Sequence, residues 1–231
     1  MKLKLFEYEN SIEFDDYINV VYFENKKEFA SKIEDLYRFC EGEEIPNKFV
    51  LTDNGNLISL SKTCLLINDI LGFNLNDKRV LQKIYYSIYE NYKIEDESEM
   101  EFNNCINNLK IFFQKIMLSM DLDLNANYEV DLLDLMKVFK PSIDAEDMTF
   151  KSMIFNIIDL CSEVNLYKII IFRNIKALFD ISELEEIYKY SLYKKIHLLL
   201  LEQGYISEVE SDYEKILFID NDYDEHVILK R

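Results

Sequence analysis

Side chains that carry oxygen recur at every second position between residues 121 and 131. They are Asp121, Asp123, Asn125, Asn127, Glu129 and Asp131. Alternate side chains of an extended chain point to the same side, so this spacing gathers carboxylates and amides into the oxygen-rich environment that Ca²⁺ prefers. The segment is not an EF-hand loop, because Ala126 takes the place of the turn glycine and Leu132 that of the bidentate glutamate. The pattern is compatible with a calcium site or with a solvated acidic hinge.

Basic residues are spread over several stretches with helical spacing. The groups are Lys78, Arg79 and Lys83; Lys110 and Lys115; Lys137 and Lys140; and Lys168, Arg173, Lys176, Lys189, Lys194 and Lys195. Each group alone is typical of a solvated helix face. In an oligomer, however, such faces could line a shared basic surface that binds phosphates without reading bases.

The chain lacks the motifs of common catalytic sites. Neither G-x-x-x-x-G-K-[ST] nor G-x-G-x-x-G occurs, and with four glycines in all a phosphate-binding loop is not expected. His197 and His226 lie in predicted strands, without a recognisable Ser/His/Asp or Cys/His set. The four cysteines have no C-x-x-C spacing, which predicts buried reduced thiols. We therefore expect a protein that is not an enzyme.

The composition is that of a folded and strongly acidic protein. With 231 residues, 49% of them hydrophobic, the chain can bury a substantial core. A formal net charge of −18 argues against a uniformly basic nucleic-acid-binding protein. It still permits one surface where cations cluster, or bound divalent cations. No run of about 18 apolar residues and no basic-then-apolar leader occurs, so we expect a cytoplasmic protein without a membrane partner.

The clearest structural signal lies between residues 166 and 203. Two short apolar runs, 169–172 and 196–201, flank a charged stretch in which Asp180 or Ser182 can begin a helix. This order predicts two parallel strands joined by a crossover helix, and hence an α/β fold. Polar residues follow the two runs: Arg173, Asn174, Glu202 and Gln203. Such strand ends usually bind ligands, but without a phosphate loop we expect structural or interfacial roles for them.

The other elements are predicted from apolar periodicity, caps and turns. We expect a hairpin of strands near 3–5 and 18–22, a helix over 26–40, and a hairpin of 48–52 and 56–60 around Asn54-Gly55. Helices follow over 62–71, 78–92, 102–120, 129–139 and 148–163, with an acidic loop at 95–101, before a strand pair at 216–219 and 227–229. The two long helices around the acidic loop predict a helical hairpin, the leg, which projects from the α/β body.

Five stretches resemble, in their order and spacing, the type II-A CRISPR-associated adaptation protein, the Csn-two family. They are 68–76 (NDILGFNLN), 132–137 (LLDLMK), 168–174 (KIIIFRN), 200–202 (LLE) and 216–223 (ILFIDNDY). The resemblance implies a ring-forming homotetramer. Each subunit would have an α/β head related to P-loop ATPases, with a degenerate nucleotide site, and an inserted α-helical leg. We assign residues 1–60 and 141–231 to the head, and 61–140 to the leg with its acidic hinge.

The resemblance also implies a function. Family members encircle the ends of double-stranded DNA, use Ca²⁺ to hold the ring conformation, and support spacer acquisition alongside the integrase proteins and the effector nuclease. The calcium ligands are then expected among Asp121, Asp123, Asn125, Glu129 and Asp131. For the sequence-independent DNA contacts we nominate Lys78, Arg79, Lys83, Lys110, Lys115, Lys137 and Lys140. The alternatives are a protein-interaction scaffold with little direct DNA contact and a degenerate nucleotide-binding enzyme.

Overall fold

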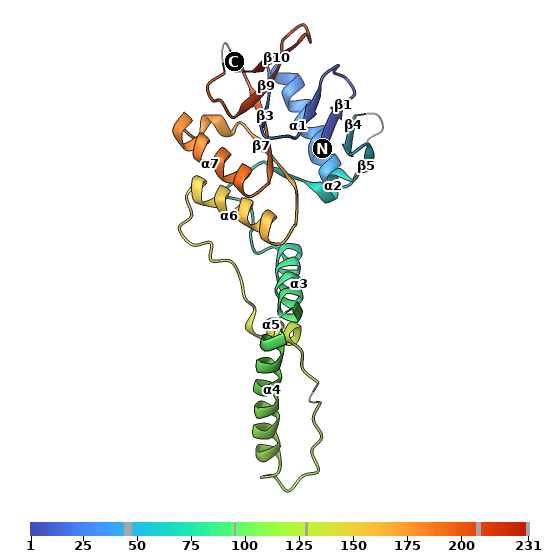
Figure 1. Cartoon of the computed structure of the whole chain (residues 1–231), viewed down its shortest axis with the longest axis vertical. Helices are drawn as coiled ribbons and strands as arrows, with labels where there is room; N and C mark the ends of the chain where they lie inside the picture. The colour runs from blue at the N-terminus through green and yellow to red at the C-terminus, as the bar shows by residue number, and fades with distance from the viewer. Residues whose placement is uncertain (44–47, 95, 128, 207–208, 230–231) are drawn as a thin grey trace. The chain divides into compact units, whose positions relative to one another are not determined.

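The computed structural model describes residues 1–43, 48–94, 96–127, 129–206 and 209–229. The chain forms two compact units (Figure 1). The first, the α/β unit, combines residues 1–73 with 146–231, and the second, the helical unit, comprises residues 74–145. With two sheets and seven α-helices among the described residues, the protein is of the mixed α/β class. None of its described helices is long and apolar enough to cross a membrane.

A six-stranded sheet forms the centre of the α/β unit. Its order is β10-β9-β3-β8-β7-β6, and all neighbours run parallel except β10 and β9. The strands are β3 (Ile18–Phe23), β6 (Cys64–Ile67), β7 (Ile169–Arg173), β8 (His197–Gln203), β9 (Glu214–Ile219) and β10 (Glu225–Leu229). The inner strands are apolar on both faces, as expected for a parallel sheet that helices cover on both sides. The predicted β7–β8 unit and the closing strand pair are confirmed.

Capped helices flank this sheet. They are α1 (Lys26–Cys40), α6 (Phe150–Glu163) and α7 (Ile181–Tyr193), with the 3₁₀ turn η1 (Ile175–Ala177) before α7. Their N-caps are Asn25, Thr149 and Asp180, whose side-chain oxygens accept backbone N–H groups of the first turn. One face of the sheet packs with α1 and the smaller sheet in a single core cluster.

The smaller sheet is antiparallel, with the order β2-β1-β4-β5. Its strands are β1 (Lys2–Leu5), β2 (Ser11–Glu13), β4 (Phe49–Asp53) and β5 (Asn56–Ile58). Asn54 and Gly55 connect β4 to β5 with φ values of 48° and 81°. Positive φ at both central residues is what a type I′ hairpin turn requires, so the predicted hairpin is confirmed.

Two predictions in the α/β unit are wrong. Residues 18–22 do not form a hairpin with 3–5, because β1 pairs with β2 while β3 enters the larger sheet between β8 and β9. Residues 62–71 do not form a helix. The short helix α2 (Leu60–Thr63) ends at once, and Cys64–Ile67 pairs with β7 as strand β6. A four-residue apolar run does not distinguish strand from helix by its period.

The helical unit contains α3 (Lys78–Ile94), α4 (Asp96–Met117) and α5 (Leu132–Phe139). Helix α4 begins at Asp96, so residues 96–101 are helical and do not form the predicted acidic loop, while residue 95 lies outside the described residues. Acidic residues are favourable in a first helical turn. Within this unit α4 continues roughly along the line of α3, and the described residues 118–127 and 129–131 lead back toward α5, which contacts α3 (Figure 1). The predicted antiparallel helical hairpin is therefore wrong.

Candidate functional site

The predicted calcium ligands lie on the segment that connects α4 to α5, whose described residues form no helix or strand. Asp121, Asp123, Asn125 and Glu129 are all exposed. Among the described residues, no group of three or more His, Cys, Asp or Glu side chains is arranged to hold a metal ion. Ca²⁺ takes six to eight oxygen ligands, so in this conformation the segment does not form a calcium coordination shell. A calcium site here requires the segment to fold around the ion.

Asp131 has a local structural role at the end of the same segment. Its carboxylate accepts the backbone N–H of Asp134 at 2.8 Å, and the Asp134 side chain accepts the Asp131 N–H at 3.4 Å. This reciprocal capping box begins α5 at Leu132, three residues after the predicted start at Glu129. Any ion that bound Asp131 would compete with the cap.

The predicted DNA contacts all lie in the helical unit. Lys78, Arg79 and Lys83 are on α3, Lys110 and Lys115 on α4, and Lys137 and Lys140 at the end of α5. Six are exposed, and Lys110 is half-buried. Arg79 and Lys83 share a face of α3 because they are four residues apart. Lys110 and Lys115 point about 140° apart around α4, so one chain does not align them.

Two of these cations are already paired with carboxylates. The Arg79 Nε lies 3.5 Å from Asp77 Oδ1, and the Lys137 Nζ lies 2.8 Å from Asp134 Oδ1. These pairs are exposed and contribute little to stability, so phosphate could displace them. They leave the cations available to an anionic ligand.

The helical unit also exposes many large apolar side chains, a feature that its amphipathic sequence did not reveal. Within the described part of α4, only Ile106 is buried. Phe112, Phe113 and Ile116 are about half exposed, and Leu118 is 85% exposed. A groove of 240 Å³ runs between Ile106, Leu109, Phe113 and Met117 on α4 and Ala126 and Val130 on the returning segment. Apolar surface of this extent is typical of an interaction site.

At the carboxyl edge of the larger sheet, where α/β proteins usually hold ligands, hydrogen bonds within the chain connect neighbouring segments. Only Glu24 and Asn25 connect β3 to α1, and Asn25 is the helix cap. Glu24 accepts the Asn221 N–H at 3.1 Å, and Gly204 donates to the Phe23 carbonyl at 3.0 Å. This connection is too short for a glycine-rich phosphate loop.

A buried ionic cluster, which the sequence did not predict, lies in the core of the α/β unit. The Lys176 Nζ, from η1, contacts both Glu214 oxygens at 2.9 and 3.1 Å, and the Tyr188 hydroxyl donates to Glu214 Oε1 at 2.8 Å. Burial disfavours the charged form of Lys176, but the Glu214 carboxylate outweighs this effect and raises the pKa of Lys176. These partners are 38 and 26 residues apart, so no local pattern announces them.

Glu202 ends the apolar run of β8 and is only 5% exposed. Burial raises its pKa to about 7, although its Oε1 accepts the Lys176 N–H at 3.2 Å. Glu202 does not line any of the three cavities found among the described residues.

The histidines and cysteines form no catalytic set in the described part of the chain. The His197 ring packs on Phe14 with centroids 5.5 Å apart, and His226 Nε2 lies 3.2 Å from Asp220 Oδ2. All four cysteines are free. Cys64 and Cys161 are buried as predicted, Cys40 is partly buried, and Cys105 is exposed, which corrects the expectation for it.

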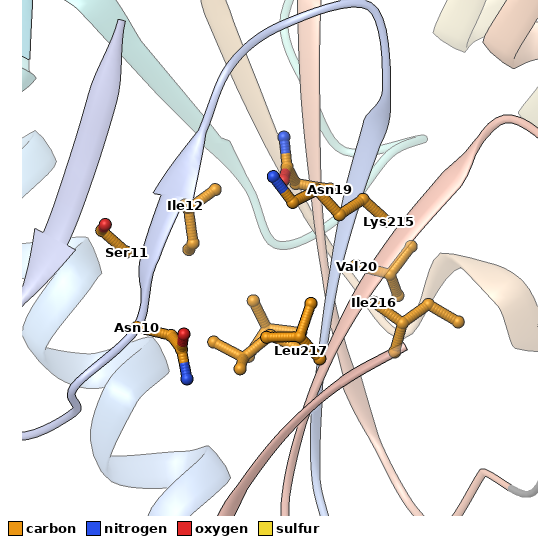
Figure 2. Close-up of a pocket in the computed structure, with 10 residues that line it drawn as sticks. Asn10, Ser11, Ile12, Asn19, Val20, Lys215, Ile216 and Leu217 are labelled. Carbon is orange, nitrogen blue, oxygen red and sulfur yellow. The ribbon is translucent and has the colours of Figure 1, made fainter. Parts of the chain in front are cut away.

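One crevice between β2, β3, β9 and β10 is shown in Figure 2. Ile12, Val20, Ile216 and Leu217 dominate its wall, and its volume is 20 Å³. A space of this size holds about one water molecule. The crevice is a packing defect between strands and too small for a substrate.

Taken with these sites, the fold defines a mixed α/β protein with a mainly parallel sheet, a hydrogen-bonded carboxyl edge and a separate helical unit rich in exposed apolar and basic residues. A model of the family described as CRISPR-associated protein (Cas_Csn2) matches residues 41–223. The chain belongs to this family, which places it in the CRISPR context of adaptation.

One solved structure agrees with this assignment at the level of the fold. The crystal structure of Stu0660 of Streptococcus thermophilus matches with a TM-score of 0.55 and 11% sequence identity, covering 100% of this chain and 77% of that one. A putative ATP-binding protein of an ABC transporter from Pyrococcus furiosus matches with a TM-score of 0.43 and 9% identity, over 94% of this chain and 97% of that one. The second likeness is too weak to support an argument.

Proposed function

We propose that the protein assembles into a homotetrameric ring that binds the ends of double-stranded DNA, without sequence preference, in support of spacer acquisition. The observation that carries this proposal is the helical unit, which presents seven candidate DNA-binding cations and a large exposed apolar surface on the same 72 residues, 74–145. Apolar surface drives assembly, and assembly can bring dispersed cations together. The protein would act in the cytoplasm, where it meets DNA.

Self-assembly is supported by the exposed side chains of α4 and the segment after it. Phe112, Phe113 and Leu118 place large hydrocarbon groups in water, which costs about 25 cal/mol for each Å² that a partner surface could cover. A second copy is one partner that would remove this cost.

Binding to phosphates follows from charge. A chain with a net charge of −18 repels DNA from most of its surface, so cationic faces concentrate contact where assembly brings them together. Contacts to phosphates carry no base information, which predicts sequence-independent and salt-sensitive binding. A closed ring adds a preference for free ends because DNA must enter through the hole.

Calcium is part of this proposal. The alternating oxygens of Asp121, Asp123, Asn125, Glu129 and Asp131 support it by their chemistry, since Ca²⁺ prefers such ligands. Because the described segment is not arranged as a site, the ion would have to order it on binding. Ordering the α4–α5 connection would in turn fix the cations at the end of α5.

We further propose that the protein is not an enzyme and that its head is a P-loop-ATPase-like fold whose nucleotide site has degenerated. The support is the two-residue connection between β3 and α1, together with the hydrogen bonds at this edge. The head would then serve as a scaffold for the ring.

A second candidate is a protein-interaction scaffold that docks the CRISPR integrase proteins or the effector nuclease and scarcely touches DNA. The apolar groove of 240 Å³ favours it, since grooves lined by aliphatic and aromatic side chains bind apolar anchors of partner proteins. Both candidates can use the helical unit, so they must be separated by charge variants.

Charge reversal at Lys78, Arg79 and Lys83 separates the two candidates, with reversal at Lys26, Lys27 and Lys62 of the α/β unit as the matched control. If the protein binds DNA through the helical unit, the first variant binds a linear duplex at least tenfold more weakly, and its salt dependence falls by about one counterion for each phosphate that it no longer binds. The control variant binds like the parent. Equal DNA binding by all three proteins would contradict the assignment of these side chains to DNA and favour the scaffold.

A further inference from the structure

A cleft of 430 Å³ opens at the amino edge of the larger sheet, where the chain enters β7 and β8. Its polar lining includes Asp53, Asn165, Lys168, Lys194, Lys195 and His197. This edge is opposite the carboxyl edge. The volume is in the range of pockets that bind small ligands, which is about 300 to 1,000 Å³.

The lysines of this cleft differ in whether a carboxylate pairs with them. Lys194 caps the end of α7, and its Nζ pairs with Asp159 at 2.8 Å and Glu163 at 3.1 Å. Lys168 and Lys195 are exposed, and within the described part of the chain neither ammonium group has a carboxylate within ion-pairing distance. The hollow therefore holds two cations without an ion-pair partner against the one lining carboxylate of Asp53, whereas the whole chain has a net charge of −18.

The backbone at this edge is occupied by its own hydrogen bonds. The His197 N–H donates to the Lys168 carbonyl at 3.0 Å, and the Lys195 N–H donates to the Leu192 carbonyl at 3.1 Å. The Lys168 N–H donates to the Thr63 carbonyl at 2.9 Å, so the strands are fixed at the point where the cations emerge. A ligand in the cleft is therefore recognised by side chains, which stand on a rigid base.

His197 supplies a hydrogen-bonding group without a charge at neutral pH. Burial lowers its pKa, the amino group of Met1 adds to this effect, and the carboxylates of Asp15 and Asp16 oppose it. The ring is held by its packing on Phe14. It can thus donate to or accept from a ligand beside the two ammonium groups.

We propose that this cleft binds the phosphate group of a phosphate monoester, held between Lys168 and Lys195 with His197 as a hydrogen-bonding neighbour. Near pH 7 such a group carries a charge of about −1.5 to −2, which matches two uncompensated ammonium groups. The cleft is larger than a phosphate alone and leaves room for the esterified part. The chemistry is shared by a free nucleoside monophosphate and by a 5′-phosphorylated DNA end, and these are the two sources that the test must distinguish.

This site is independent of the DNA contacts proposed above, because all of those lie in residues 74–145 and the cleft lies in the α/β unit. Asp53 is the carboxylate among the lining residues, and its charge opposes that of the ligand. Removing it should therefore strengthen binding, whereas removing either lysine should weaken it. A general loss of the fold would weaken binding in every variant, so it would not produce these opposite changes in affinity.

The test titrates the full chain with AMP, and with adenosine as the uncharged comparison, by calorimetry at constant ionic strength. Lys168→Gln and Lys195→Gln should each weaken AMP binding about tenfold, which corresponds to about 1.4 kcal/mol for a hydrogen bond to a charged group. Asp53→Asn should strengthen it several-fold. Lys26→Gln with Lys27→Gln, two exposed cations where α1 begins, is the matched control and should leave binding unchanged. Equal thermal midpoints confirm that the variants fold.

A second arm compares short duplexes with and without a 5′-phosphate. Where AMP binds, a preference for the phosphorylated duplex that Lys168→Gln abolishes identifies a DNA end as a source, whereas no such preference identifies a small ester, and either result supports the site. The proposal is overturned if AMP does not bind, if adenosine binds equally well, or if the control variant weakens binding as much as the lysine variants. In each of these cases duplex binding through the helical unit can persist, so the two proposals fail separately.

Discussion

The side-chain oxygen of Asn174 accepts the backbone N–H of Gln203 at 3.0 Å and so joins the carboxyl ends of β7 and β8. The Asn174 N–H donates to the Leu201 carbonyl at 2.9 Å, which makes the link double. Asn174 adopts φ = 50°, a left-handed conformation that asparagine tolerates better than most residues. At this carboxyl edge of the sheet, where α/β proteins often bind ligands, Asn174 instead connects β7 to β8.

This link predicts a graded effect of substitution at Asn174. Asn174→Gly should lose the side-chain hydrogen bond, at about 1 kcal/mol, while keeping the left-handed backbone. Asn174→Ala should lose the bond and also strain the backbone, so it should cost about 1 to 2 kcal/mol more. Urea unfolding measures both, and equal stability of the two variants would show that the backbone conformation is not under strain.

Glu202 predicts a pH-dependent contribution to stability. Its pKa is raised from 4.5 to about 7 in the folded protein, so its contribution is fully present below pH 4.5 and is lost as the pH rises to about 7. The total change is about 3 kcal/mol. Glu202→Gln should remove this dependence and be more stable than the parent at pH 8. Exposed Glu13→Gln serves as the control, and urea unfolding curves that fall equally with pH in parent and Glu202→Gln would contradict the assignment.

Lys176 and Glu214 predict a large effect from breaking a buried pair. The Lys176→Met substitution leaves the Glu214 carboxylate buried with Tyr188 as a remaining partner, which should cost about 3 to 5 kcal/mol. Lys189→Met removes a more exposed pair with Glu185 and should cost less than about 1 kcal/mol. Thermal or urea unfolding compares the two variants. A similar small loss in both would mean that Lys176 does not compensate a buried charge.

Calcium binding predicts a stabilisation of the acidic segment. If Ca²⁺ orders residues 121–131, adding the ion should raise the thermal midpoint relative to chelator, and Asp121→Asn with Asp123→Asn should remove the rise. Glu97→Gln with Glu99→Gln, exposed acids of the first turns of α4, should retain it. An unchanged midpoint in the parent protein would count against calcium.

Asp131→Ala should weaken α5 by about 1 kcal/mol even without calcium, because the capping box is lost. Faster hydrogen exchange at the first amides of α5 would report this change, and Asp131→Ser, which can still cap, should restore the protection. Unchanged exchange in Asp131→Ala would contradict the capping role.

The parts of the fold that local sequence specifies were predictable. The β7–α7–β8 unit was anticipated because its apolar runs are short and Asp180 caps the helix between them. Strand β6 was not, because Ser61 and Gly72 bracket a stretch that looks like a capped helix, and only its pairing with β7, about 100 residues later, makes it a strand. The burial of helix α4 could not be predicted from its sequence. The spacing of α4 suggested a buried stripe, yet the single chain leaves most of it uncovered.

Some functional features could be predicted from sequence motifs, and others depend on tertiary contacts. The resemblance to the Csn-two family, which the family match confirms, depends on motifs between residues 68 and 223. The Lys176–Glu214–Tyr188 cluster and the amino-edge cleft depend on residues brought together from distant segments, and no spacing rule reveals them.

The central claim, that the assembled protein binds the ends of double-stranded DNA, is tested most directly with linear and covalently closed DNA of the same sequence. Gel shifts at low salt with Ca²⁺ should show strong binding to the linear form and weak binding to the closed form, and cutting the closed form once should restore binding. Equal affinity for both forms, or no binding to either, would contradict the account.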